Sequence, residues 1–474
     1  MLVACGGGGG GSSGSQQIGP TSNDGVLRIE AYERTASMSG VQLRSRSISP
    51  MAPAVVPARV VLDPLGAIAI DASPRAAGQP VRVGLERDIV ATATPAALAG
   101  WLDWQALSSG GQVAAITFRS QGAASLRLAL RVERLPAQAV LSVFGMEGDV
   151  TRVTGSEVLE GLARSAAGSG AAPGTGLYWL PPAAGEEATV QIELPAGMVA
   201  DAVAVALPRL SHQWWSPVWA RSASEPVQPR AAGACQLDAN CESQWSQEAN
   251  AVARMVFQSG GSSYTCTGTL MANTSGTGTP YFLTANHCVG NQTEADTVVT
   301  YWFYRSTACN SGVASSPVQV TGGATLLHTS GDSDVSFMRL NQNPPVGAVY
   351  AGSLVGQPAI QVGVGALHHP DGSWLRFSEG TIASYAFCNG TSCGASSDDS
   401  GNYLRLTWNA NRGVTEAGSS GSPIFATVSN KHYVVGHLFA GTSSCTNTGG
   451  ADYYGRFDRV YPSLKTWLGT VPGS

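Results

Sequence analysis

The amino-acid sequence predicts an all-β protein in which a double β-barrel is preceded by a β-sandwich-like region. The first observation is the turn content. The 474 residues include 58 glycines and 26 prolines, which suits a turn-rich β protein better than a helical one. The second is a series of short apolar runs, bounded by Gly, Pro or Asp, along most of the chain. The length is sufficient for two or three ordinary domains.

Residues 26–215 form the predicted sandwich-like region. The run at residues 125–132 partly alternates apolar and polar side chains, as a half-buried strand does. His212 lies beside Trp214 and Trp215 and is interpreted as a packed residue, because no catalytic constellation surrounds it. The predicted strands of this region are residues 26–30, 58–62, 81–85, 113–118, 124–132 and 139–144.

Residues 216–232 are rich in Pro, Ala, Ser and Arg and have no hydrophobic period, which predicts a linker or processing segment. Arg221 and Arg230 lie in it. Residues 233–474 suit a double β-barrel with two similar halves. Strand-like runs occur at residues 281–284, 298–303, 335–340 and 434–439, and residues 461–468 are predicted to form a short closing helix.

Residues 1–25 are predicted to be a tether. Leu2, Val3, Ala4 and Cys5 resemble a bacterial lipobox, in which the cysteine is lipidated, and a Gly/Ser run follows. Only four residues precede Cys5, which is shorter than the charged and apolar regions of an ordinary signal peptide. The alternative is an unmodified cysteine in a disordered head.

Charge and hydropathy exclude two classes of function. Charged residues make up 12% of the chain, the net charge is −5, and the sequence contains no basic cluster that could hold nucleic-acid phosphates. A nucleic-acid-binding protein is therefore excluded. No apolar run reaches the roughly 20 residues that a membrane-spanning helix needs.

Eight of the nine cysteines lie at or after Cys235. This clustering predicts disulfides and an oxidising compartment. A zinc site is disfavoured because no pair of cysteines has the two-residue spacing typical of zinc ligands. The adjacent histidines His368 and His369 are not expected to bind a metal, since neighbouring side chains tend to diverge. No metal and no cofactor are expected.

Residues 418–423, with the sequence Gly-Ser-Ser-Gly-Ser-Pro, are predicted to present a nucleophilic serine, Ser420. The pentapeptide Gly-Ser-Ser-Gly-Ser also occurs at residues 11–15, but there it lies in the Gly/Ser run and is interpreted as tether. A serine nucleophile needs a histidine base and a carboxylate that orients the base. His287 and Asp334 precede Ser420 in the chain order of the chymotrypsin fold.

Asp334 opens an apolar run and is therefore expected to be buried, as the orienting carboxylate must be; Asp332 is the alternative. The backbone N–H groups of Gly418 and Ser420 are the predicted oxyanion donors. The other histidines, His328, His432 and His437, are interpreted as structural. Cys288 is not expected to be a thiol nucleophile, because adjacent residues rarely point at each other.

These residues resemble the lysyl endopeptidase group of bacterial trypsin-like serine proteases. The resemblance covers most of residues 233–468. It rests on Gly-Ala-Cys at 233–235 with Cys241, Tyr-Phe-Leu-Thr-Ala-Asn-His-Cys at 281–288, Ser-Asp at 333–334, His-His-Pro at 368–370, Gly-Val-Thr-Glu-Ala-Gly-Ser-Ser-Gly-Ser-Pro at 413–423 and Asp-Tyr-Tyr-Gly-Arg at 452–456.

The resemblance implies a chymotrypsin-like double β-barrel with the triad His287, Asp334 and Ser420, and a pro-region before it. It places the substrate-binding carboxylate at Asp452, with Phe439 and Gly441 nearby. Phe439 stands where the best-known form of the family has His. The disulfides that it implies are Cys235–Cys445, Cys241–Cys309 and Cys266–Cys288, which leaves Cys388 and Cys393 to pair with each other.

The predicted function is therefore a serine endopeptidase that cuts proteins or peptides after Lys, with Arg left open. The chain has only two lysines, Lys431 and Lys465, which fits either a GC-rich genome or a protease that avoids its own target. A monomer that is secreted, or lipid-anchored in a bacterial envelope, is expected. The alternatives are a catalytically silent surface lipoprotein with a β-sandwich binding module, and a related protease of different specificity.

Overall fold

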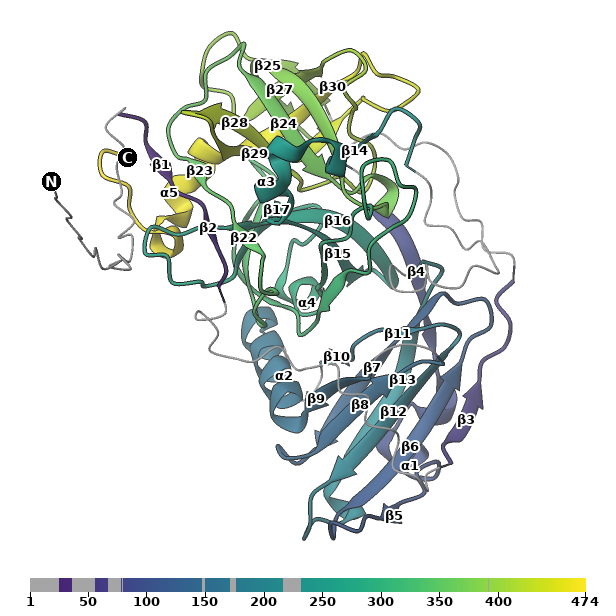
Figure 1. Cartoon of the computed structure of the whole chain (residues 1–474). Helices are drawn as coiled ribbons and strands as arrows, with labels where there is room; N and C mark the ends of the chain where they lie inside the picture. Colours follow the sequence, from purple (N-terminus) through teal and green to yellow (C-terminus); the bar gives the residue numbers. More distant parts are fainter. Residues whose placement is uncertain are drawn as a thin grey trace, which may run out of the picture.

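The computed structural model describes residues 25–35, 56–66, 78, 80–146, 150–170, 176–215, 232–390 and 392–474. The fold is mostly β, as the sequence predicts, and its strands gather in two parts (Figure 1). We call residues 56–215 the N-terminal part and residues 232–474 the C-terminal part. Cys5, the Gly/Ser run after it, Arg221 and Arg230 lie outside the described residues.

The N-terminal part is a sandwich of two sheets around one apolar core. Phe118, Leu128 and Val190, from three different strands, are fully buried in that core. The first sheet contains β3 (Ala58–Val61), β5 (Gln105–Ala106), β6 (Gln112–Arg119), β8 (Val140–Phe144), β9 (Thr151–Thr154) and β12 (Glu187–Leu194). The second contains β4 (Val81–Asp88), β7 (Ser125–Arg134), β10 (Tyr178–Trp179), β11 (Ala183–Ala184) and β13 (Ala204–Gln213).

Two helices of the N-terminal part, α1 (Pro95–Ala99) and α2 (Gly155–Ser169), are not among the predicted elements. Helix α2 begins with a capping box, in which the Thr154 side chain accepts from the Glu157 N–H and the Glu157 carboxylate accepts from the Thr154 N–H. It ends at Gly170, which has a left-handed conformation. Helix α2 contacts α4 (Gln292–Ala295) of the C-terminal part.

The first half of the C-terminal part is an open half-barrel. Its strands are hydrogen-bonded in the order β19–β18–β15–β16–β17–β21–β20. Their bounds are β15 (Val252–Ser259), β16 (Ser262–Met271), β17 (Tyr281–Ala285), β18 (Val299–Trp302), β19 (Val318–Val320), β20 (Ala324–Ser330) and β21 (Val335–Leu340).

The second half is a closed barrel, because its six strands pair in the ring β24–β25–β27–β30–β29–β28 and back to β24. These are β24 (Gly363–His368), β25 (Arg376–Asn389), β27 (Tyr403–Trp408), β28 (Pro423–Val428), β29 (Lys431–Gly441) and β30 (Ala451–Arg456), with β14 (Leu237–Asp238) and β26 (Ser392–Ala395) at the side of β25. The predicted closing helix is α5, which begins earlier than expected (Phe457–Leu468). A further short helix is α3 (Ser246–Ala249).

The two parts share one sheet, which the sequence does not predict. Strand β4 of the N-terminal part pairs with β13 on one side and with β16 of the half-barrel on the other, both antiparallel. Figure 1 shows β4 running from one part into the other. The sandwich is therefore not a separate module beside the protease-like part but is continuous with its first barrel.

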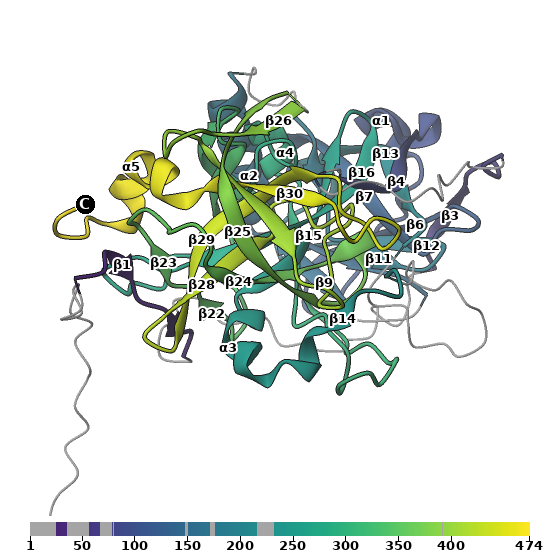
Figure 2. The same cartoon turned by 90° about the horizontal axis from the view of Figure 1, so that it is seen from above.

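The strand predicted at residues 26–30 also has an unexpected partner. Strand β1 (Arg28–Ile29) pairs with β23 (Ser353–Leu354), and β2 (Tyr32–Glu33) pairs with β22 (Val349–Tyr350), so both lie on the C-terminal part rather than in the sandwich. Figures 1 and 2 both show β1 beside β23, near α5. Apolar alternation identifies a strand but does not identify its partner, which explains the error.

Within the described parts of the chain, no helix is long and apolar enough to cross a membrane.

Candidate active site

His287 and Asp334 are joined by two hydrogen bonds. His287 follows β17, and its Nδ1 lies 2.7 Å from Asp334 Oδ2, while its backbone N–H donates to Asp334 Oδ1 at 2.9 Å. Asp334 directly precedes β21, which pairs with β17, so the neighbouring ends of two strands bring the residues together. The Asp334 carboxyl is buried, whereas the His287 side chain is 23% exposed. Two contacts fix both the position and the tautomer of the ring, because Nδ1 must carry a proton to donate.

The backbone of Asp334 is held in an uncommon conformation, with φ at 51°. Its carbonyl oxygen accepts from the Asn286 N–H at 2.7 Å and from His437 Nε2 at 3.1 Å. His437 Nε2 also donates to the Ser333 carbonyl at 3.1 Å, and burial lowers the pKa of His437.

His437 therefore holds the loop that presents Asp334. From the sequence, His437 is interpreted as structural, but this contact could not be predicted, because His437 lies on β29, far from Asp334 in the chain. Asp332, the alternative carboxylate, is exposed, and its N–H donates to Ser330 Oγ at 3.3 Å.

Ser420 lies in a tight loop between the two barrels, just before β28. Gly418 and Gly421 have φ values of 86° and 79°, which other residues rarely adopt. A Cβ on Gly421 would collide with Thr284 beside His287, so this glycine permits the close approach of the two segments. Thr267 of β16 fastens the loop: its N–H donates to the Ser420 carbonyl at 2.9 Å and its hydroxyl donates to the Gly418 carbonyl at 3.0 Å.

Ser420 Oγ and His287 Nε2 are both buried, and within the described residues neither atom has a hydrogen-bond partner. The structure shows no hydrogen bond between the predicted base and the predicted nucleophile, although Gly421, next to Ser420, lies against Thr284 and Ala285 on the segment that leads to His287. Bonds of this kind are often formed only when substrate binds.

Asp452 of β30 is fully buried, opposite Gly441 of β29. Its carboxylate accepts from Trp408 Nε1 at 2.6 Å, from Thr415 Oγ1 at 2.5 Å, and from the Ser443 N–H and hydroxyl at 3.2 and 2.5 Å. All of these donors are neutral. Burial raises the pKa of Asp452, and the hydrogen bonds oppose that rise.

Gly441 and Phe439 lie on the strand that covers Asp452. A side chain at Gly441 would overlap the Asp452 carboxyl group, so only glycine lets the strand pass at this distance. The Phe439 ring makes an edge contact with the His287 ring, at 6.1 Å between centroids, and packs on Tyr403 at 5.1 Å. The predicted base and the predicted specificity residue are thus connected by a few residues of β29.

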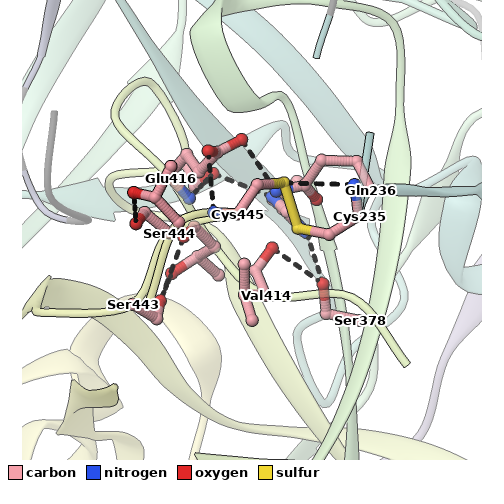
Figure 3. The surroundings of a disulfide bond; sticks show 12 residues. Cys235, Gln236, Ser378, Val414, Glu416, Ser443, Ser444 and Cys445 are labelled. Carbon is pink, nitrogen blue, oxygen red and sulfur yellow. Dashed lines mark hydrogen bonds between the residues drawn. A yellow bond between two sulfur atoms is a disulfide. The ribbon is translucent and has the colours of Figure 1, made fainter. Parts of the chain in front are cut away.

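The structure contains the three disulfides that the resemblance implies, and the two remaining cysteines pair with each other as expected. The four are Cys235–Cys445, Cys241–Cys309, Cys266–Cys288 and Cys388–Cys393. Figure 3 shows the surroundings of the first. Glu416 accepts from Gln236 Nε2 at 2.9 Å and from the Cys445 N–H at 3.1 Å. This disulfide and Glu416 therefore connect the start of the C-terminal part to the loops that carry Ser420 and Ser443.

Three other histidines, His368, His369 and His212, have structural partners. His368 lies between Ser419 Oγ (2.8 Å) and Ser378 Oγ (2.9 Å), His369 contacts the Ser373 carbonyl, and burial lowers the pKa of each histidine to about 3. His212 contacts Ser120 Oγ at 2.7 Å, and burial lowers its pKa to about 4. No cluster of side chains suited to a metal ion occurs among the described residues.

Comparison with known proteins decides the family. A family model of the lysyl endopeptidase C-terminal domain matches residues 230–455, and one of the lysyl endopeptidase N-terminal domain matches residues 62–214. A lysyl endopeptidase of Pseudomonas aeruginosa is 30% identical over 412 residues, which cover 82% of each chain. The chain belongs to the lysyl endopeptidase family. It is a trypsin-like serine endopeptidase with protein or peptide substrates, and its family and disulfides make it an extracellular or envelope protein.

Two solved protease structures resemble part of this lysyl endopeptidase family member. One is the MamO protease domain from Magnetospirillum magneticum in its apo form, with 12% identity, a TM-score of 0.32, and coverage of 46% of this chain and 98% of that chain. The other is the inactive form of the Rv3671c protease, with 13% identity, a TM-score of 0.31, and coverage of 49% and 96%.

Proposed function

We propose that this enzyme hydrolyses peptide bonds on the C-terminal side of basic residues through Ser420, His287 and Asp334. The observation that carries the proposal is the double hydrogen bond from His287 to a buried Asp334, beside the loop of Ser420. A carboxylate at Nδ1 leaves Nε2 free to accept a proton, which is the arrangement that a serine nucleophile requires.

In this mechanism Ser420 Oγ attacks the substrate carbonyl while His287 Nε2 takes its proton. Asp334 stabilises the imidazolium that forms, and His287 then gives the proton to the leaving amine. Water repeats the sequence to release the acyl group. The contact between Ser420 and His287 forms as substrate enters.

The N–H groups of Gly418 and Ser420 are the proposed oxyanion donors. Their neighbours are occupied, since the Ser419 N–H donates to the Glu416 carbonyl and the Gly421 N–H to the Leu438 carbonyl. Within the described residues, the hydrogen bonds of the structure include no acceptor for the N–H of Gly418 or Ser420. Two donors that have no acceptor among the described residues support a site where negative charge develops.

Asp452 is the proposed specificity residue. It is a buried carboxylate whose hydrogen-bond donors are all neutral. The positive charge of a basic substrate side chain would therefore compensate its negative charge. An acidic substrate side chain would be repelled. Phe439 stands where the best-known form of the family has His, and the linker holds Arg221 and Arg230 but no lysine. We therefore assign basic residues, with lysine and arginine both to be tested.

We also propose that residues 26–215 act as a pro-region, that cleavage within residues 216–232 releases the protease domain at residues 233–474, and that the protease acts as a monomer. Lipid attachment at Cys5 stays a prediction from the sequence.

The test is digestion of a mixed peptide library by the purified enzyme and by its Ser420→Ala variant, with Ser422→Ala as the matched control. We expect cleavage after lysine and arginine that Ser420→Ala abolishes and Ser422→Ala retains. Equal cleavage by the enzyme and its Ser420→Ala variant would refute the mechanism. Cleavage after Asp or Glu would refute the specificity.

An Asp452→Asn variant tests the specificity residue directly. Removing the charge should lower kcat/KM for lysine substrates by about 10²- to 10³-fold, the cost of leaving a buried cation unpaired. Hydrolysis of peptides with a neutral residue before the cleaved bond should change little. An equal loss for both substrates would show that Asp452 only maintains the fold.

A further inference from the structure

Gly78 of the N-terminal part lies against the strand that covers Asp452. A Cβ on Gly78 would overlap the Phe439 carbonyl oxygen and the Ala440 Cα. The backbone of Gly78 therefore contacts the backbone of β29 directly, close to the ring contact of Phe439 with His287. Its φ of 84° also favours glycine.

Three residues after Gly78, the chain pairs with β16, the strand whose Thr267 holds the Ser420 loop. Val81 is opposite Thr265, Gly84 is opposite Ser263, and Leu85 is opposite Ser262, all in the antiparallel β4–β16 ladder. Thr265 is two residues before Thr267, whose N–H and hydroxyl hold the Ser420 loop. Cys266, between them, forms a disulfide with Cys288, which follows His287.

These two contacts therefore tie the segment to both halves of the C-terminal part, to β29 of the closed barrel and to β16 of the half-barrel. Residues 78 and 81 are separated by three residue steps, which span at most about 10–11 Å. Both Ser420 Oγ and His287 Nε2 are buried here.

From Gly78 to Val81 the chain runs in the same direction as the proposed substrate. In the proposed function, the residue before the cleaved bond reaches Asp452 beside Gly441, so the acyl side of a substrate lies along residues 439–441. The amine side then lies beyond Ser420, toward β16. Gly78 lies on the first side and Val81 on the second, in the same order.

We propose that residues 78 and 80–85 are an autoinhibitory segment that occupies the substrate-binding strands of the protease in the direction of a substrate. The segment is suited to resist hydrolysis. The residue on the amine side is Pro80, whose nitrogen is tertiary and whose ring restricts the residue before it. The sequence has no lysine or arginine from Ala76 to Val81. The ladder to β16, continuous with the sandwich through β13, holds the segment in place.

This inference rests on the proposed function, and the experiment separates the two. A fluorescent fluorophosphonate, which attaches to an activated serine hydroxyl, is added to the freshly purified full chain, and labelling of the full-length band is followed in gels. The variants are Gly78→Asn and the matched Gly197→Asn, with Ser420→Ala as the blank. Gly197 has the same φ of 84°, but a Cβ there meets nothing within 4 Å. Asparagine tolerates this φ, so each variant adds mainly a side chain.

We expect Gly78→Asn to be labelled about tenfold faster than the wild type, because displacing the segment increases the fraction of molecules with a free serine. Gly197→Asn should match the wild type. Where Gly78→Asn does not accumulate, Gly78→Ala carries the same collision and serves instead. Equal labelling of the wild type and both glycine variants overturns the inference and leaves the proposed function standing. Labelling that Ser420→Ala retains overturns the proposed function, and the inference falls with it.

Discussion

At the scale of residues, the site depends on one buried carboxylate and the groups that hold it. Asp334 supports the His287 ring through two oxygens, while its own carbonyl is fixed by Asn286 and His437. In the proposed mechanism, a histidine oriented in this way loses little freedom when it becomes charged, so these hydrogen bonds stabilise the transition state more than the resting enzyme.

Replacing Asp334 by Asn should reduce kcat by about 10⁴-fold, because an amide can hold the ring in the wrong tautomer and cannot stabilise the imidazolium. The matched control is Asp332→Asn, which changes the same residue type two positions earlier, where the side chain is exposed. Steady-state hydrolysis of a basic chromogenic peptide measures both. A large loss in Asp332→Asn with an active Asp334→Asn would reverse the assignment.

Replacing His437 by Phe should lower kcat/KM by about 10- to 100-fold, since two buried carbonyls lose a donor and the Asp334 loop relaxes. His437→Gln keeps a donor and should recover most of the activity. The pH dependence of kcat/KM distinguishes positioning from simple destabilisation, because a smaller folded fraction scales the whole profile down, whereas a displaced Asp334 changes its shape. An unchanged profile in an active His437→Phe enzyme would argue against this role.

At the scale of elements, β4 and β13 determine how the N-terminal part meets the protease. Strand β13 lies between β7 and β4, and β4 in turn lies between β13 and β16. The apolar residues of this junction form a cluster of their own, in which Val81, Val83 and Trp215 pack against Val256 and Tyr301. Such burial is non-directional and is favoured in proportion to the apolar area removed from water.

His212 of β13 should make the N-terminal part sensitive to acid. Its pKa is about 4 in the folded chain and 6.5 ordinarily, so the unfolded chain binds the proton first as the pH falls. The free energy of unfolding should be unaffected above pH 6.5 and decrease by up to about 3 kcal/mol toward pH 4. Urea unfolding at several pH values, with Ser420→Ala as background, measures this loss. His212→Gln does not titrate and should lose less; equal losses would exclude His212 as the cause.

Many elements could be predicted from sequence, because they depend on local pattern. The strand predicted at residues 335–340 has those bounds in the structure. Helix α2 was missed although Thr154 and Glu157 have capping-box spacing and Gly170 follows, so the signal was present. The partners of β1 and β4, and the reach of His437 to the Asp334 loop, depend on contacts between distant segments, which no local pattern encodes.

At the scale of the whole molecule, the disulfides close loops of very different length. Cys235–Cys445 closes 210 residues and lies next to Glu416, whereas Cys388–Cys393 closes only 5 residues of the β25–β26 hairpin. The Cys235–Cys445 bond links the start of the C-terminal part to the loop between its last two strands, β29 and β30.

Removing Cys235 and Cys445 together, as a double alanine variant, should destabilise the chain by about 5 kcal/mol in the chain-entropy model, against about 2 kcal/mol for Cys388 and Cys393. The difference follows from loop length. Thermal unfolding of both variants in the Ser420→Ala background gives the comparison. Equal shifts in Tm would mean that local packing, rather than the length of the closed loop, determines the stabilisation.

The pairing of β4 with β16 has a consequence for solubility. While β4 is in place, both edges of β16 near Thr265 are covered, and no open row of backbone donors and acceptors is presented there. Departure of β4 uncovers that row, and a bare strand edge is a template on which another chain can align, including a second copy of the same enzyme. The segment that restrains the serine thus also guards against strand-to-strand aggregation, and the enzyme is best kept concentrated with it attached.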